Sequence, residues 1–291
     1  MMKRSLIHQS NSQRFQYSKR QFKNMQPASP RYSDTKTFGT QAGLSNLPAF
    51  KHLLLFKVPD QIVRNLRSRS MSVQYAHNEG YTNDLNTDYY SAKITKMPVI
   101  NGSTMTSKEL LKHIRLNINS FINTKYADFQ PYSSSIDGPV WRSDNPLGAV
   151  MKIDIMGPDN ASVVCSFYSS DELGWGFTTI EAPATGEHPV SGNREFFISE
   201  KSGYNLFVIK GLDIGSSGIP GLGLPILEGI GYSIADKLWK SMRQKVMNFI
   251  NSNGGSATVS HTYQKETEWR YVYWHYKKDL ASVFGPGAGS A

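Results

Sequence analysis

The sequence predicts an α+β fold, in which an antiparallel meander sheet is packed by a long C-terminal helix and preceded by a basic, largely disordered leader. Five runs of alternating or β-branched residues follow one another between residues 149 and 209, with turn residues between them. Residues 233–253 repeat apolar side chains at the 3.6-residue helical period. The first 46 residues are rich in Ser, Gln, Asn, Lys and Arg, a composition too polar to pay for the entropy of ordering.

Charge divides the chain into two parts. Residues 1–100 hold 15 Lys and Arg against 5 Asp and Glu (+10), whereas residues 101–291 hold 17 against 18 (−1). We therefore expect a basic leader and linker over residues 1–100, an α+β domain over 101–285 and a flexible tail over 286–291. Seven cations precede the first acidic residue, Asp34. A delivery apparatus or an acidic protein surface would suit residues 1–50 as a partner, and a merely solvating tail is the alternative.

Two short elements are expected before the domain. Residues 53–56 form an apolar patch, and Pro59 opens a possible short helix over 60–67. Residues 64–69 hold three arginines without interleaved aromatic residues, which gives no support for sequence-specific nucleic-acid binding. The polar stretch 78–95 has the composition of a linker.

Inside the domain, a capping box at Thr106 and Glu109 begins a helix with one apolar stripe. The predicted strands are 149–155, 162–167, 175–180, 195–198 and 205–209, followed by a further strand over 257–263. Ser233 is expected to cap the long helix, which ends at Asn253 and Gly254. Residues 266–284 have the pattern of one more helix.

Residues 211–231 combine many Gly and Pro residues with apolar side chains, so we expect no regular helix before the end of this stretch. A lid or cavity wall over the sheet explains the apolar side chains, and a plain packed loop or a membrane-inserting loop are the alternatives. The proposed lid residues are Ile219, Leu222, Leu224, Ile226 and Leu227.

Candidate catalytic chemistry is limited to Glu187, His188, Arg194 and Glu195, where a histidine beside carboxylates could act as a general base. Two arguments oppose this: neighbouring strand residues point to opposite faces, and His188 precedes Pro189 in a long turn. Arg194 and Glu195 need be no more than a surface pair.

Other classes of site find little support. The single cysteine, Cys165, lies in an apolar run and is interpreted as a buried, inert thiol. The sequence contains no metal-ligand spacing, no cofactor motif and no run long enough to span a bilayer as a helix. The N-terminus lacks the apolar core of a Sec signal peptide.

Several motifs together resemble a domain at the C-terminal tip of Rhs-type polymorphic toxin proteins of Bacteroidetes. The resemblance covers about residues 106–285 and departs from the family at Phe197 and over 209–213. The residues that carry it are 117–121, 129–132, 144–148, 162–166, 175–180, 188–196, 248–255 and Trp269. It implies a toxin or effector made in the bacterial cytoplasm and then exported or injected, for example as cargo of a contractile injection system.

The order of elements is also similar to helix-grip domains of the START and polyketide-cyclase type, in which a curved sheet wraps a long helix around an apolar cavity. Three functions remain open. The first is a delivered effector whose domain binds an apolar ligand or a membrane. The second is a hydrolase- or cyclase-type enzyme that uses the cavity with His188 or Tyr204. The third is a structural adaptor whose leader binds an acidic partner.

Overall fold

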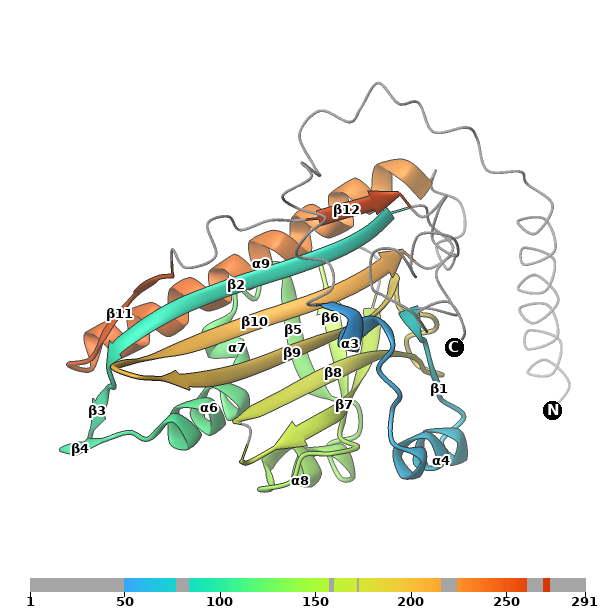
Figure 1. Ribbon diagram of the computed structural model, residues 1–291. Coiled ribbons are helices and arrows are strands. Elements are labelled where there is room, and N and C mark those ends of the chain that lie inside the picture. The colour runs from blue at the N-terminus through green and yellow to red at the C-terminus, as the bar shows by residue number, and fades with distance from the viewer. Residues whose placement is uncertain are drawn as a thin grey trace, which may run out of the picture. The chain divides into compact units, whose positions relative to one another are not determined.

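The computed structural model of the chain describes residues 50–76, 84–156, 160–171, 173–215, 224–260 and 269–272. The expectations for the leader over residues 1–46 and for the tail over 286–291 concern residues outside these ranges. The described residues build an α+β fold around one large antiparallel sheet (Figure 1).

The sheet contains the predicted meander. Its strands lie in the order β11 (Ser256–Val259), β2 (Asp84–Lys96), β10 (Tyr204–Gly215), β9 (Val190–Lys201), β8 (Gly174–Glu181), β7 (Asn160–Ser169), β6 (Val150–Ile155) and β5 (Ala127–Pro131). β1 (Ser72–Val73) pairs with β8, and a separate hairpin joins β3 (Val99–Ile100) to β4 (Ser103–Thr104). The five predicted runs are β6 to β10, each paired with the next, so the meander is confirmed.

Two predicted elements are wrong. Residues 84–96 do not form a linker but the 13-residue strand β2, which pairs with β10 from Leu85 to Ile94. Its polar residues misled the prediction because several of them are buried and paired rather than solvated. Within the stretch 266–284, predicted as helical, Trp269–Val272 forms strand β12 and pairs with the start of β2.

Helices cover both faces of the sheet. We call the face toward α6 (Ser107–Leu116), α7 (Ile118–Phe121) and α9 (Leu224–Ser252) the helix face, and the opposite one the outer face. Alternate residues of β2 and β5 to β10 meet these helices and α8 (Asp137–Arg142) in the main core. The outer face is covered by α3 (Lys51–Leu54) and by α4 (Asp60–Ser68), which packs on Val150, Val164 and Ile180.

Helix termini largely follow the sequence signals. The Thr106 hydroxyl accepts from the Glu109 amide and the Glu109 carboxylate accepts from the Thr106 amide, so the predicted capping box is present. α9 begins at Leu224, nine residues before the predicted Ser233, so the expectation of no regular helix before the end of residues 211–231 is wrong. Pro225 falls in the first turn, where its missing N–H is not needed. The helix ends at Ser252, and Gly254 follows with φ of 72°, as expected for a left-handed stop.

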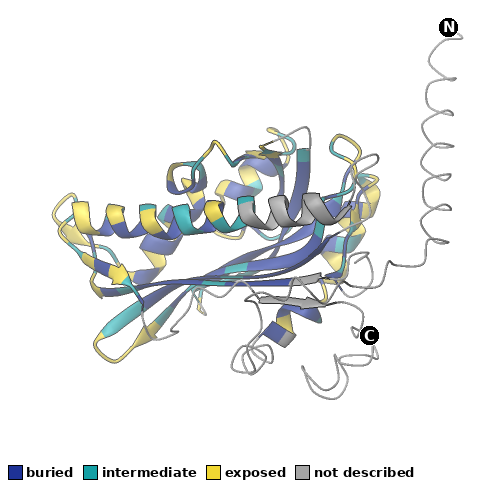
Figure 2. Ribbon diagram, turned by 90° about the horizontal axis from the view of Figure 1, so that it is seen from above, coloured by how far each residue is buried: buried dark blue, intermediate teal, exposed yellow. Residues whose placement is uncertain are grey.

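α9 presents the predicted apolar stripe to the sheet. Leu238, Trp239, Met242, Val246 and Ile250 are buried at helical spacing, while the opposite side of the helix is exposed (Figure 2). A long C-terminal helix on one face of an antiparallel meander is the helix-grip arrangement, so the predicted fold class is confirmed.

Candidate functional site

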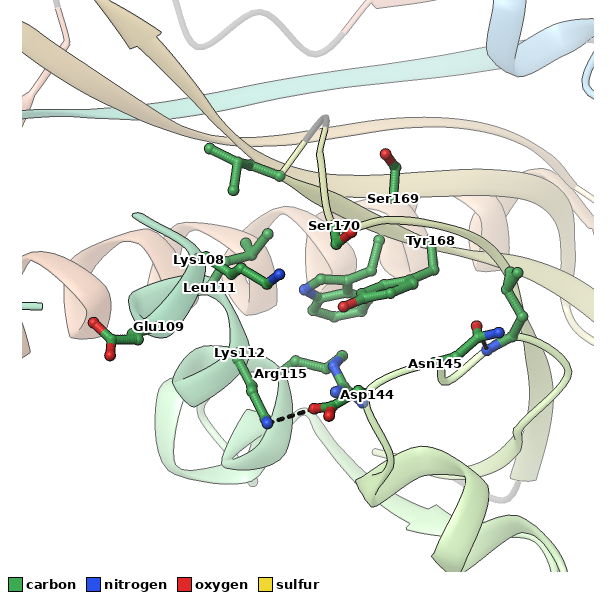
Figure 3. Close-up of a pocket in the computed structure, with 13 residues that line it drawn as sticks. Lys108, Glu109, Leu111, Lys112, Arg115, Asp144, Asn145, Tyr168, Ser169 and Ser170 are labelled. Carbon is green, nitrogen blue, oxygen red and sulfur yellow. Dashed lines mark hydrogen bonds and ion pairs between the residues drawn. The ribbon is translucent and has the colours of Figure 1, made fainter. Parts of the chain in front are cut away.

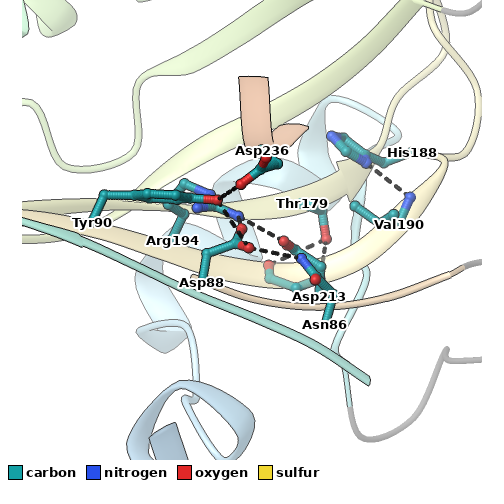
Figure 4. Close-up of polar contacts among 10 residues, drawn as sticks. Asn86, Asp88, Tyr90, Thr179, His188, Val190, Arg194, Asp213 and Asp236 are labelled. Carbon is teal, nitrogen blue, oxygen red and sulfur yellow. Dashed lines mark hydrogen bonds and ion pairs between the residues drawn. The ribbon is translucent and has the colours of Figure 1, made fainter. Parts of the chain in front are cut away.

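The most unusual feature of the helix face is a group of charged and polar side chains near one end of β2, β9 and β10. Register places them in two adjacent rows across these strands. One row consists of Arg194, Gly211 and Asp88, and the next of Gly192, Asp213 and Asn86. We call Asn86, Asp88, Tyr90, Arg194, Asp213 and Asp236 the Arg194 cluster (Figure 4).

Glycine in each row makes room for the charged side chain beside it. A Cβ atom at Gly211 would lie 2.3 Å from the Arg194 guanidinium carbon, and one at Gly192 would lie 2.5 Å from an Asp213 carboxylate oxygen. Both distances are far shorter than a van der Waals contact. The side chains of Arg194 and Asp213 therefore lie flat over the neighbouring strand, which only glycine permits at these two positions.

Arg194 forms the centre of the cluster. Its Nη2 donates to Asp88 Oδ2 at 2.5 Å and to Asp213 Oδ2 at 2.8 Å, and its guanidinium carbon lies 4.6 Å from the centre of the Trp239 ring on α9. The Tyr90 hydroxyl donates to Asp236 of α9 at 2.8 Å. The cluster thus links three strands to α9 through the contact of Arg194 with Trp239 and the bond of Tyr90 to the partly buried Asp236.

Burial and crowding of like charges set the protonation of these groups. Burial raises the pKa of Asp213 to about 6, with a further rise from Asp88 and an opposing effect of Arg194. Burial also raises the pKa of Tyr90 well above its usual range, together with Asp88 and Asp236, so its hydroxyl remains a donor. Asp213 is therefore a buried carboxyl that can gain or lose a proton near neutral pH.

Two buried polar atoms of the cluster lack hydrogen-bond partners within the described part of the chain. They are Nη1 of Arg194 and Oδ1 of Asn86. Buried polar atoms are normally paired in a finished core, so such atoms point to a polar group that completes the cluster. A donor and an acceptor are both available for such a group.

The other predicted catalytic residues do not join this cluster. Glu195 points to the outer face, where it pairs with His52 at 2.9 Å and Lys210 at 3.7 Å, so the suggested Arg194–Glu195 surface pair is wrong. His188 is buried in the turn before β9, its amide donates to Gln74, and its Nδ1 accepts from the Val190 amide. Burial lowers the pKa of His188 to about 4, which keeps the imidazole neutral at physiological pH. Glu187 is half-buried in the same turn.

Tyr204 and Cys165 also lie outside the cluster. Tyr204 begins β10, nine residues before Asp213, which corresponds to about 30 Å along a strand. Cys165 is fully buried, and burial raises the pKa of its thiol to about 12, as expected for an inert cysteine.

The predicted lid cannot be located in the same way. Ile219 and Leu222 lie outside the described residues. Leu224, Ile226 and Leu227 belong to the first turn of α9, where only the backbone is described. By chain connection, this segment leads from β10, which carries Asp213, to α9, which carries Asp236.

Sequence reasoning found Arg194 but missed Asp88, Tyr90, Asp213 and Asp236. Arg194 and Asp88 are 106 residues apart, and nothing in the sequence alone gives the register that pairs them. The available signal was the recurrence of glycine two residues from a charged side chain, in 192–194 and again in 211–213.

The described ranges were predicted to hold neither a metal site nor a membrane-spanning helix. No three His, Cys, Asp or Glu residues there are arranged to hold a metal ion. No helix there combines the length and the hydropathy needed to cross a bilayer.

Comparison with known proteins gives a structural likeness alone. No family model matches the chain, and no curated protein matches it. Among solved structures, the chain is similar to that described as "Crystal structure of Ara h 8.0201", with a TM-score of 0.34 and 8% sequence identity. The match covers 58% of this chain and 99% of that one.

Proposed function

We propose that the domain binds a small, largely apolar molecule with one polar group at the Arg194 cluster, and that the protein acts as a delivered effector. The unpaired Nη1 of Arg194 and Oδ1 of Asn86, buried under α9, are the observation that carries the proposed binding site. A ligand hydroxyl could accept from Nη1 of Arg194 or donate to Oδ1 of Asn86, whereas a ligand carbonyl could only accept from Nη1 of Arg194. The hydrogen bond would strengthen ligand binding because it forms in a buried site from which water is excluded.

The apolar part of the ligand would lie toward α9 and the chain that leads into it. Aromatic rings already fill the space between the sheet and the helices farther along, where Trp175 stacks on Phe196 at 4.0 Å and Phe196 meets Trp239 at 5.4 Å. This packing restricts the ligand to the end of the sheet that holds Arg194. The expected lid residues, Ile219, Leu222, Leu224, Ile226 and Leu227, follow β10 in the sequence and lead into α9, and their proposed role is to cover the ligand.

The effector role is supported by the resemblance to Rhs-type toxin domains. Its motif residues include Arg194 at the cluster and Trp175, which packs in the main core. The basic residues 1–50 would then engage the delivery apparatus, for example of a contractile injection system. Deletion of residues 1–49 should abolish loading, whereas it should leave binding of the apolar molecule unchanged.

The neutral fluorescent probe N-phenyl-1-naphthylamine tests the binding site. The full chain should bind it with a Kd of about 1–10 μM, and Leu222→Asp should weaken binding at least tenfold while the protein still melts cooperatively. Ile136→Asp places the same charge on a side chain that is 57% exposed and should have no effect. Equal binding by all three proteins would contradict the proposed site.

An acid–base enzyme of the hydrolase or cyclase type is the second candidate, because Asp213 has a pKa of about 6 in a buried site. Asp213 is a better candidate for the acid–base residue than His188, because the lowered pKa of His188 makes it a weak base at neutral pH. If the site is catalytic, a panel of p-nitrophenyl esters should include a substrate whose turnover Asp213→Asn reduces at least 100-fold without loss of probe binding. Unchanged turnover in that variant would exclude Asp213 as the catalytic acid.

A further inference from the structure

A cavity of about 730 Å³ lies on the helix side of the sheet, away from the residues of the Arg194 cluster. Its walls come from α6, from the turn after α8 and from the ends of β7 and β8 (Figure 3). The volume falls within the range of small-molecule sites. The residues that the argument uses are Lys108, Leu111, Arg115, Tyr168, Leu173 and Trp175.

Arg115 is the most informative residue of this cavity. It is only 1% exposed, and its terminal nitrogens donate to the carbonyl oxygens of Trp141 and Ser143, the latter at 2.8 Å. Its guanidinium carbon lies 5.2 Å from the Trp141 ring and 5.8 Å from the Tyr168 ring. No carboxylate in the described ranges lies within ion-pair distance of it, and the nearby Asp144 carboxylate only partly offsets the effect of burial, which lowers the pKa of Arg115.

The two carboxylates of the cavity are both engaged by other groups. The Asp144 carboxylate is held by Lys112 at 2.6 Å, and the Glu109 carboxylate is occupied by the Thr106 amide and hydroxyl. Lys108 is exposed and forms no ion pair with any described residue. The lining therefore carries one positive charge more than its carboxylates neutralise.

Trp175 supplies a second, independent sign of a missing partner. The residue is completely buried and lines the cavity, yet its indole Nε1 has no acceptor in the part of the chain that the structure describes. An indole N–H can only donate, so whatever pairs with it must be an acceptor. An excess of positive charge and a donor without an acceptor, in one cavity, both favour an oxyanion.

We propose that this cavity binds a small organic anion, with one carboxylate or phosphate group on an aromatic or short aliphatic body. The oxyanion would pair with Arg115 and Lys108, since guanidinium and ammonium groups form charge-assisted hydrogen bonds with such groups. The body would lie against Leu111, Leu173 and the ring of Tyr168. This site is independent of the proposed interior site, which takes a neutral molecule.

Calorimetric titration of the full chain with phenyl phosphate and with benzoate tests the proposal, with benzyl alcohol as the neutral counterpart. We expect at least one anion to bind with a Kd below about 1 mM, and benzyl alcohol to bind at least tenfold more weakly. Binding of both anions identifies the shared oxyanion as the recognised group, whereas binding of one alone identifies it as phosphate or carboxylate. The proposal fails if the neutral compound binds as well as the anions, or if neither anion saturates the protein at about 10 mM.

Matched lysine variants locate the site. Lys108→Ala should weaken binding of the anion about tenfold, because one charge-assisted hydrogen bond is lost, while Lys125→Ala removes an exposed lysine outside the cavity and should change nothing. Asp144→Asn removes a rim carboxylate and should tighten binding a few-fold. Equal losses in both lysine variants would place the anion elsewhere. Because the naphthylamine probe is neutral and this site is tested with anions, failure of one proposed site leaves the other one testable.

Discussion

Gly192 and Gly211 decide where the charged side chains of the helix face can lie. Each occupies the place where any other residue would put a Cβ atom into a neighbouring charged group or backbone oxygen. The cluster is therefore specified by small residues as much as by Arg194 and Asp213 themselves. This dependence can be measured directly.

Gly211→Ala should lower the free energy of unfolding by about 1–3 kcal/mol, since the new methyl group would lie 2.3 Å from the Arg194 guanidinium carbon. Arg194 cannot move aside without breaking its bonds to Asp88 and Asp213. In an Arg194→Ala background the same substitution should cost much less, and urea unfolding of the four proteins in this cycle measures the difference. An equal cost in both backgrounds would show that the methyl group does not meet Arg194.

Asp213 should leave a signature in the pH dependence of stability. Its folded pKa of about 6 lies above the unfolded value of ~3.9, so the native state binds the proton more tightly. The stability that this carboxyl contributes is complete below pH ~4 and is lost as the pH rises through 6. Asp213→Asn should remove this loss, so that relative to wild type the variant gains on the order of 1–3 kcal/mol between pH 4 and 7.

Urea unfolding at pH 4, 5, 6 and 7 tests this, with Asp154→Asn as the control at an exposed carboxylate. Asp88, Arg194, Tyr90 and Asp236 surround the site and remain in both proteins. If the free energies of unfolding of the wild type and of Asp213→Asn change in parallel over this pH range, the Asp213 carboxyl is ionised throughout. The proposed acid–base role of Asp213 would then lose its basis.

At the scale of elements, the sequence predicts what depends on local pattern. The strands β6 to β10 either alternate or are dense in β-branched and aromatic residues, and α6 and α9 carry apolar stripes with capping signals. β2 was missed because Asn86, Asp88 and Ser91 have the composition of a linker, although all three are buried. Their burial depends on partners in β9, β10 and α9, which no local pattern reveals.

Trp239 should account for much of the docking of α9. It packs on Phe196 at 5.4 Å, on Phe129 at 6.4 Å and against Arg194 at 4.6 Å. Trp239→Ala should therefore cost ~3–5 kcal/mol in the free energy of unfolding. Lys237→Ala, at an exposed position of the same helix, should cost less than ~0.5 kcal/mol. A melting temperature unchanged by Trp239→Ala would contradict the assigned helix face.

At the scale of the whole molecule, the described fold begins earlier than charge and composition predict. Phe50, Leu53 and Leu54 are buried, α4 covers the outer face, and β2 lies inside the sheet between β10 and β11. The predicted leader over residues 1–100 therefore includes parts of the folded unit. The function is even harder to predict from the sequence. The Arg194 cluster and the cavity at α6 both consist of residues that are distant in the sequence and are brought together by strand pairing and helix packing.

Truncation separates the folded unit from the predicted leader. A chain that begins at residue 50 should unfold cooperatively and bind the neutral probe, whereas one that begins at residue 101 loses β2 and should aggregate or melt without cooperativity. Circular dichroism melts of both fragments provide the measurement. If a chain that begins at residue 101 were as stable as the full chain, the claim that the fold requires β2 would be wrong.

The position of a bound apolar molecule tests the central claim most directly. Crystals soaked with 6-bromo-2-naphthol, whose hydroxyl supplies the polar group of the proposed ligand, would show the bromine by its anomalous scattering. We predict a peak beside Arg194 and Trp239, beneath the N-terminal half of α9, that disappears in crystals of Leu222→Asp. A peak confined to the α6 cavity or to contacts between molecules, from a protein that binds the probe in solution, would contradict the proposed interior site.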